Sequence, residues 1–295
     1  MHNAFVPELF DFTPPDHSAQ PISLLEILRQ AYDSPILKPV MPYDPDALFS
    51  ARIRDACKDG RPEEIRRLTA LWFSADENEE HLERKTEELF WVATLLLAGS
   101  GKPGQKPRLD FFLMHILNAA LFLPSLAKVI RKTESKVKLF RAFLPTMFFI
   151  LIIRGRPRID AELIMTYTRS PHPPGIPKLN PDASALGDLN DPDSVNPWPA
   201  IIASVIHAPE THIVKVIRAL YYAAQKYGHT APGDVPGALK GTKETHKGIA
   251  MVDGTVFVRA AGVAMDTLGW VTFGQKEGDW DRSALGWDDA WKGDD

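Results

Sequence analysis

The chain has 295 residues, of which 44% are hydrophobic and 24% charged, so it can bury a sizeable core and intrinsic disorder is excluded. Its formal net charge of -4 offers no basic field to attract phosphates, which argues against a nucleic-acid partner. The single cysteine, Cys57, can form neither an internal disulfide nor a cysteine metal cage. This cysteine usage fits a reducing compartment, and we expect a cytoplasmic protein.

The first residues, MHNAFVPELFDFTPPD, lack the basic start and apolar run of a secretory signal, so we expect the mature chain to begin at or near Met1. The longest nearly uninterrupted apolar run, residues 143–153, is shorter than the roughly 20 residues that a membrane-spanning helix needs. It is flanked by Arg141 and Arg154. The sequence therefore predicts a buried core helix here and no membrane partner.

Apolar and charged residues recur three and four positions apart along the first half of the chain, which is typical of helices. Residues 45–100 fit three helices, and Gly60 followed by Arg61-Pro62 marks the end of one and the start of the next. The Gly- and Pro-rich segment SGKPGQKP, residues 100–107, ends this region. Further helices are predicted over residues 109–126, divided or kinked at Pro124, and over 133–153 and 159–167.

The second half begins with a loop. Residues 169–199 contain eight prolines, which predicts a long connection of the kind that often covers a site. A helix is predicted at 209–228, followed by a Gly-rich loop to about residue 248. Residues 249–271 fit either a hairpin or an amphipathic helix, and we favour the helix. In the tail from residue 273, three tryptophans are available to pack against the body: Trp280, Trp287 and Trp291.

These elements predict an all-α fold, a multi-helix single domain with long Pro- and Gly-rich loops. No repeat at a fixed period of 20 to 50 residues is visible, which argues against a solenoid. We expect residues 1–20 to form an irregular N-terminal segment and residues 21–295 to form the helical domain.

Local signatures of several enzyme classes are missing, because the chain has no GxGxxG after a strand, no GxxxxGK[ST], no GxSxG and no HExxH. Histidines remain as candidates. His115 lies in the very apolar segment LDFFLMHILNAALF, where an imidazole must find a buried hydrogen-bond partner or bind a ligand. A core histidine with its hydrogen bonds satisfied is the alternative reading.

A second candidate cluster lies at the start of the helix predicted over 209–228. His212 and Lys215 are three residues apart and project from one face. Lys215 has apolar sequence neighbours, so its amine could be partly desolvated, depressed in pKa and able to carry a metal-binding carbamate. Arg218 follows on the same face and could hold a carboxylate, a phenolate or a cofactor phosphate. Solvated capping residues and surface ion pairs are the alternative reading.

Several blocks of this sequence resemble the questin-oxidase-like proteins of fungi, which include Baeyer-Villiger type oxidases of polyketide pathways. The blocks span nearly the whole chain and read LLEILRQAYDSPIL with MPYDPDAL (24–48), EELFWVATLLLAGSGKPGQKPRLDFFLMHILNAALFLPSL (87–126), HIVKVIRAL (212–220) and DWDRSALGWDDAW (279–291). The resemblance implies a helical oxidoreductase that oxidises aromatic polyketides such as anthraquinones with O2 and NADPH. Ring opening or ester insertion would be the outcome.

The resemblance also implies a site. The family has no flavin motif and is similar to non-haem iron enzymes, so the resemblance makes His115, His212 and Lys215 candidate ligands of ferrous iron. Arg218 becomes the candidate catalytic residue. The resembling proteins are typically longer and carry clustered histidines of the form HNHxxHH and an HPLIH-like stretch, neither of which occurs here. The chain is therefore expected to hold part of the metal site, as a fragment, an inactive member or one completed by a partner, such as a second copy.

Two other classes of function remain open. One is a non-catalytic helical module that binds an aromatic metabolite or a partner protein. The other is a hydrolase or lyase that uses His212 with Asp281 as acid and base. We also expect that apolar helix faces covered in longer relatives are exposed here and favour association.

Overall fold

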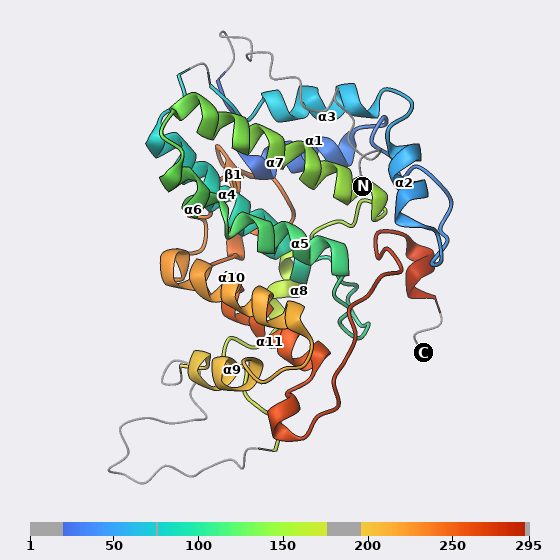
Figure 1. The fold of residues 1–295 in the computed structure, drawn as a ribbon, viewed down its shortest axis with the longest axis vertical. Coiled ribbons are helices and arrows are strands. Elements are labelled where there is room, and N and C mark those ends of the chain that lie inside the picture. Colours follow the sequence, from blue (N-terminus) through green and yellow to red (C-terminus); the bar gives the residue numbers. More distant parts are fainter. Residues whose placement is uncertain (1–19, 75, 176–195, 293–295) are drawn as a thin grey trace.

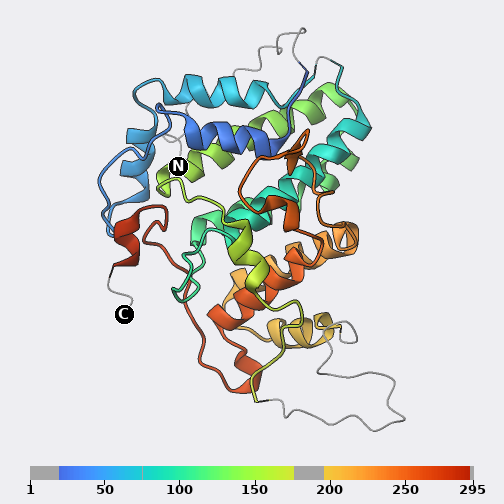
Figure 2. The same cartoon turned by 180° about the vertical axis from the view of Figure 1, so that it is seen from behind.

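The computed structural model describes residues 20–74, 76–175 and 196–292. The expected irregular segment 1–20 lies almost wholly outside these residues. The described residues form eleven α-helices, ten of them with seven residues or more and α8 with six. They are joined by loops and one very short hairpin, which confirms the all-α fold class (Figures 1 and 2). Their bounds are α1 Leu24–Asp33, α2 Phe49–Ala56, α3 Arg61–Ala70, α4 Glu79–Ala98, α5 Phe111–Ala120, α6 Leu123–Val129, α7 Thr133–Ile153, α8 Ala161–Thr166, α9 Trp198–Val205, α10 Thr211–Tyr227 and α11 Val256–Leu268.

The hairpin pairs β1 (Leu239–Lys240) with β2 (Lys243–Glu244) in antiparallel register. Three 3-10 turns complete the described elements: η3 Ile249–Met251, η4 Val271–Phe273 and η5 Asp288–Trp291. The helix favoured over the hairpin for residues 249–271 is therefore confirmed by α11.

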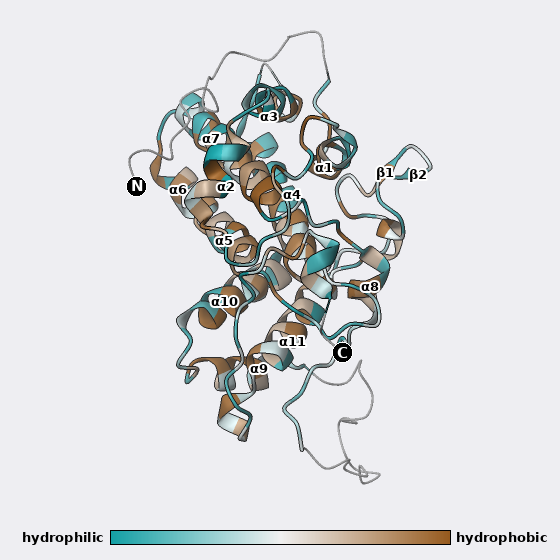
Figure 3. Ribbon diagram, turned by 90° about the vertical axis from the view of Figure 1, so that its right-hand side faces the viewer, coloured by the Kyte–Doolittle hydropathy of each residue, from teal (hydrophilic) through white to brown (hydrophobic). Residues whose placement is uncertain are grey.

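Helix α4 forms the centre of the molecule. Its side chains from Glu88 to Ala98 are all buried, and it packs against α1, α5, α10 and α11. A helix that is apolar on every side is stable only when other helices surround it. Apolar surfaces accordingly face inward along α4, α5, α10 and α11 (Figure 3). The main core is thus one continuous cluster that includes residues from Leu24 to Trp280, and a small second cluster contains Leu285, Ala290 and Trp291 of the tail.

The end of α7 is set by a glycine turn. The N–H of Arg156 donates to the carbonyl oxygen of Leu151 at 2.8 Å, and the N–H of Gly155 donates to that of Ile152 at 3.0 Å. This is the Schellman pattern, which needs a left-handed residue after the helix, and Gly155 supplies it with a φ of 83°. The Trp287 ring packs against Gly155, so closely that a Cβ there would lie 2.2 Å from it.

The sequence analysis missed one helix. It ended the Pro-rich loop at residue 199 and left 200–208 unassigned, whereas α9 begins at Trp198. Pro199 stands in the first turn, where a helix has no use for the missing N–H. The proline that was interpreted as part of the loop is therefore part of a helix start. Residues 176–195 of the same predicted loop lie outside the described residues.

The apolar run 143–153 lies within α7 and is largely buried, as expected. Elsewhere in the described ranges, the stretch Phe111–Val129 is long and apolar enough to cross a membrane by length and composition alone, with 39% of it buried. The core helix of a soluble protein passes the same test, so this stretch carries no membrane assignment. A turn at residues 121–122 divides it into α5 and α6, and Pro124 stands in the first turn of α6.

Candidate active site at the start of α5 and α10

The start of α5 is fixed by a buried carboxylate. Asp110 is the N-cap, and its Oδ1 accepts the N–H groups of Phe112 at 2.8 Å and Leu113 at 3.2 Å. Its Oδ2 accepts the Nε–H of Arg154 at 2.7 Å, and both side chains are buried. Arg154 therefore neutralises a carboxylate that burial would otherwise penalise. The first turn of α5, which carries Phe111 and leads to His115, is held by these bonds.

His115 lies on the solvent side of α5 rather than in the core. The expectation of a buried imidazole is wrong, because the side chain is exposed while the residues on either side of it, Met114 and Ile116, are buried. Its Nδ1 lies 2.7 Å from the carbonyl oxygen of Phe111. A carbonyl only accepts, so Nδ1 carries the hydrogen and Nε2 keeps its lone pair.

The pKa of His115 is lowered. Desolvation is the main cause, and the positive charges of His212, Lys215 and Arg282 add to it, against the hydrogen bond to Phe111. A lowered pKa keeps the imidazole neutral near pH 7. Neutral imidazole is the form that binds a metal or accepts a proton.

His212 is oriented by Glu210, the N-cap of α10. The Nδ1 of His212 lies 2.6 Å from Oε1 of Glu210, so again Nε2 is left open. The other oxygen, Oε2, accepts the N–H groups of His212 at 2.8 Å and Ile213 at 3.0 Å and the indole N–H of Trp280 at 2.7 Å. Burial would raise the pKa of Glu210, but the hydrogen bonds from Trp280, His212 and Ile213 lower it.

The two histidines meet across α5 and α10, with ring centroids 5.4 Å apart. The Phe111 ring contacts both, at 4.8 Å from His115 and 5.0 Å from His212. The guanidinium of Arg282 lies 4.0 Å from the centroid of the Phe111 ring and covers it. The site thus combines two imidazoles, one aromatic ring and one cation from three segments of the chain. We call these residues and Glu210 the histidine-pair site.

Lys215 and Arg218 lie on α10 beyond His212, and both side chains are exposed. Lys215 is close enough for its charge to depress the pKa of His115. Its expected desolvation is wrong: the apolar neighbours Val216 and Ile217 point into the core, so Lys215 projects to solvent. Arg218 lies one turn further along the same exposed face.

Asp281 is not the partner of His212. Its Oδ2 accepts Nε–H of Arg108 at 2.9 Å, and its Oδ1 accepts the N–H and hydroxyl of Ser283 at 2.8 and 2.7 Å. The backbone of Asp281 also bonds to that of Phe111 and Leu109 at 2.8 and 2.9 Å. The acid and base pair proposed for a hydrolase or lyase is therefore replaced by a structural anchor of the tail.

Sequence reasoning missed three members of the site, Phe111, Glu210 and Arg282, and also the hydrogen bond that Trp280 donates to Glu210. Glu210 was placed only in the first turn of its helix, although an acidic residue two positions before a histidine at a helix start is a signal for a cap that also bonds the ring. Trp280 and Arg282 reach the site only because the tail returns to α5. Figure 1 shows this tail crossing from the lower helices to the side of α2.

Part of a metal site fits these residues. With metal–nitrogen bonds of about 2.1 Å, two imidazoles on one ion have centroids roughly 5 to 6 Å apart, which the pair satisfies. Each Nδ1–H is bonded to an acceptor, as in metal-ligating histidines. However, no three His, Cys, Asp or Glu side chains gather around one point within residues 20–74, 76–175 and 196–292. The described residues therefore offer two imidazoles to an ion, and they do not form a complete set of ligands.

The fold and the site define an all-α domain with a carboxylate-oriented histidine pair at its surface. The family model for questin oxidase-like proteins matches residues 6–220. The chain belongs to the questin oxidase-like family, which confirms the resemblance seen in the sequence blocks.

Three relatives carry names that state an activity. Baeyer-Villiger oxidase AgnL3 of Paecilomyces divaricatus is 28% identical over 58% of this chain and 33% of its own length. Baeyer-Villiger monooxygenase dmxR6 of Cryptosporiopsis sp. is 24% identical over 80% of this chain and 48% of its own. Baeyer-Villiger oxidase mdpL of Emericella nidulans is 23% identical over 68% and 40%. The chain thus matches between a third and a half of each of these relatives.

Proposed function

We propose that the chain provides the histidine-pair site of an oxidoreductase that oxidises aromatic polyketides of the anthraquinone type in a Baeyer-Villiger reaction. O2 would be the oxidant and NADPH the reductant, in the cytoplasm. Family membership and the names of the relatives support an oxidative role. The observation that carries the proposal is the pair of imidazoles, 5.4 Å apart, whose Nδ1 atoms are both engaged and whose Nε2 atoms are both open.

In this proposal His115 and His212 hold ferrous iron through Nε2. Held there, ferrous iron would supply redox chemistry toward O2. Glu210 keeps the ring of His212 in one orientation, and Phe111 packs edge-on against both imidazole rings. Remaining donors would be water, a carbamate on Lys215, or groups from other parts of the protein or from a second copy. Arg282 and, further along α10, Arg218 provide positive charge that suits the phenolate or quinone oxygens of the substrate.

Metal analysis tests this proposal. The purified chain is reconstituted anaerobically with ferrous iron, and iron per chain is compared among wild type, His115→Ala, His212→Ala and Lys215→Ala. The matched control is His229→Ala, which removes an exposed histidine outside the site. We expect about one iron per chain in wild type and the control, and at least a tenfold loss of affinity in the two site histidine variants. Iron binding that ignores both His115 and His212 would overturn the metal assignment.

A non-catalytic module is the second candidate, and it is favoured by the lack of a third ligand within the described residues. The two candidates differ in their need for metal and oxygen. An anthraquinone that binds the iron-free chain with unchanged affinity, without oxygen uptake in the presence of iron and NADPH, would support the module. Oxygen uptake that requires His115 would support the oxidase.

A further inference from the structure

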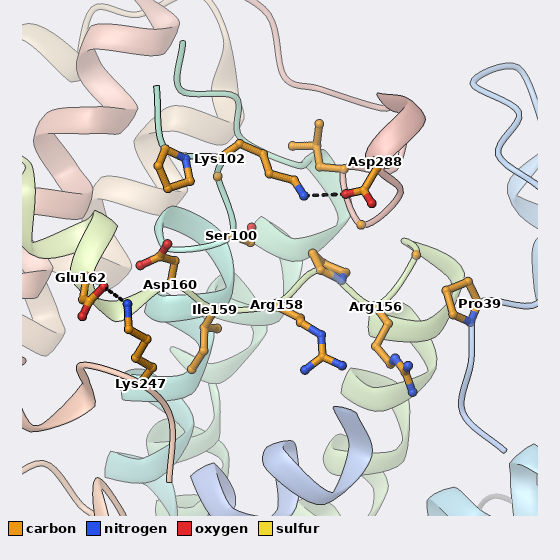
Figure 4. A pocket seen from close by; sticks show the side chains of 16 residues that line it. Pro39, Ser100, Lys102, Arg156, Arg158, Ile159, Asp160, Glu162, Lys247 and Asp288 are labelled. Atoms are coloured by element: carbon orange, nitrogen blue, oxygen red, sulfur yellow. Dashed lines mark hydrogen bonds and ion pairs between the residues drawn. The ribbon is translucent and has the colours of Figure 1, made fainter. Parts of the chain in front are cut away.

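A second candidate binding site lies at the C-terminal end of α7. A cavity of about 520 Å³ opens there between the loop after α4, the loop between α7 and α8, and the tail (Figure 4). Its volume is within the range of pockets for small molecules. It shares no lining residue with the histidine-pair site. Four basic side chains line it, Lys102, Arg156, Arg158 and Lys247, together with three acidic ones, Asp160, Glu162 and Asp288.

The two arginines stand on a rigid main chain. The Schellman turn at Gly155 places Arg156 at a φ of 55°, an uncommon conformation for a residue with a side chain. Just beyond it, the Tyr32 hydroxyl donates to the carbonyl oxygen of Pro157 at 2.9 Å and accepts the N–H of Ile159 at 3.2 Å. These bonds fix the residues on both sides of Arg158. The arginines are therefore held in place before any ligand arrives.

The arginines differ from the lysines in their partners. Lys102 pairs with Asp288 at 2.6 Å and Lys247 with Glu162 at 2.6 Å, and these exposed pairs are marked in Figure 4. Arg156 instead donates to the carbonyl oxygens of Ala31 and Ser34, and Arg158 to that of Tyr32. Carbonyls at the end of α1 are ordinary acceptors for arginine, but they carry no full negative charge.

Two positive charges thus lie close together. Desolvation is the main cause that lowers the pKa of Arg156, the charge of Arg158 adds to it, and Tyr32 and Asp33 act against it. Each group uses one terminal nitrogen in its carbonyl bonds, so further N–H donors remain for a ligand. An anion with several oxygens would relieve the repulsion and accept these donors together.

We propose that this cavity binds a phosphate-bearing small molecule, with the phosphate on Arg156 and Arg158 and with Lys102 and Lys247 at the rim. The rim lysines can exchange their exposed carboxylates for phosphate at little cost, because exposed ion pairs contribute little to stability. A nucleotide and free inorganic phosphate offer the same chemistry. NADPH is included as a probe because the proposed function needs it. Only this part of the test rests on the proposed function.

Calorimetric titration of the full chain tests the site with four probes: inorganic phosphate, adenosine 2',5'-bisphosphate, NADPH and NADH. The test variants are the double variant Arg156→Gln/Arg158→Gln and the rim variant Lys247→Gln. The matched control, Arg131→Gln/Lys132→Gln, removes two exposed charges next to α7 without touching the cavity. Lys247 has an 84% exposed side chain, so its replacement tests the site even if the double variant folds poorly.

We expect saturable binding of at least one phosphate-bearing probe, weakened at least tenfold by the double variant, about threefold by Lys247→Gln and not by the control. Preference for adenosine 2',5'-bisphosphate and NADPH over phosphate would identify a nucleotide, and the reverse would identify the free anion. No saturable binding, or binding that both cavity variants leave unchanged, would overturn the inference. If NADPH-dependent oxygen uptake persists with an unchanged KM for NADPH in the double variant, NADPH is not the ligand of this cavity, while the proposed oxidase stands.

Discussion

Two regions of the chain, residues 88–98 of α4 and residues 279–291 of the tail, pack against α5 or the residues just before it. They do so through different kinds of interaction. The α4 segment is buried throughout and packs mainly apolar side chains against its neighbours. The tail is attached by directed bonds, from Arg108 to Asp281 and to the carbonyl of Ala290, and from Trp280 to Glu210. Apolar burial tolerates exchanges of similar volume, whereas directed bonds fail when one partner is lost. Stability should therefore depend chiefly on α4, and the geometry of the histidine-pair site on the tail.

The largest effect is expected in the core. Trp91 is fully buried on α4, and its ring centroid lies 4.6 Å from that of Phe257. Trp91→Ala leaves a large cavity that the surrounding side chains cannot fill. We therefore expect a loss of about 4 kcal/mol in the free energy of unfolding. Urea denaturation followed by circular dichroism measures this. Trp91→Phe is the control and should cost clearly less; equal losses would mean that packing volume at this position is unimportant.

Removing the tail anchor, formed by Arg108 and its partners in the tail, should lower the free energy of unfolding less than Trp91→Ala does. It should, however, disturb the histidine-pair site. Arg108 donates to Asp281, to Ser283 and to the carbonyl oxygen of Ala290, and it covers the Trp291 ring. Arg108→Gln leaves a half-buried carboxylate without its cation, and we expect a loss of about 2 kcal/mol. Limited proteolysis should then cleave the tail faster in the variant. A tail that resists protease as well as in wild type would contradict the anchoring role.

Acid should act outside both regions, at His246. Burial is the main cause that lowers the pKa of this side chain from 6.5 to about 4, and its ring packs edge-on against Tyr32. Below pH 6.5 the imidazole of His246 therefore binds a proton in the unfolded chain but stays neutral in the folded chain. The free energy of unfolding consequently falls as the pH drops below 6.5. Between pH 6.5 and 5 we expect a loss of about 2 kcal/mol.

Unfolding free energies at several pH values, compared between wild type and His246→Phe, measure this contribution. Phenylalanine keeps an aromatic ring against Tyr32 but cannot titrate. Parallel pH dependence of the two proteins would show that the acid sensitivity arises elsewhere.

The smallest expected effect on stability sharpens the comparison most. Trp280→Phe keeps an aromatic side chain but removes the indole N–H that Glu210 accepts. We expect a loss of about 1 kcal/mol in stability and, because Glu210 orients His212, a weaker iron affinity by roughly tenfold. The control Trp287→Phe alters the tail without touching Glu210. Equal iron affinity in wild type and Trp280→Phe would show that the hydrogen bond from the tail to Glu210 does not influence the histidine-pair site.

Much of the fold follows from the sequence, because the burial of apolar faces leaves a periodic pattern. The helix predicted over 133–153 has those bounds in the structure, and the predicted helix 209–228 is α10, from 211 to 227. Helix α9 was missed because prolines at 197 and 199 were read as loop residues, although Pro199 is compatible with a helix start. Periodicity is local, and so is the information that it carries.

The candidate site was predicted only in part for the same reason. His115 and His212 were singled out from separate blocks, and the structure brings them together. The exposure of His115 was not foreseen, because an apolar segment hides the narrow solvent side of a helix. Contacts of the tail with Glu210 and Phe111 join residues that are far apart in the chain, so no local sequence pattern predicts them.

Arg108 and Asp281, the two ends of the tail anchor, are separated by 173 residues. At the roughly 5 to 20 residues per second of protein synthesis, the anchor emerges from the ribosome about 10 to 35 s after the start of α5. During that interval the nascent chain has Phe111 without the cover of Arg282 and Glu210 without the indole of Trp280. The helical body can therefore collapse while translation continues, but the histidine pair acquires its full set of contacts only after residues 280–282 have been made.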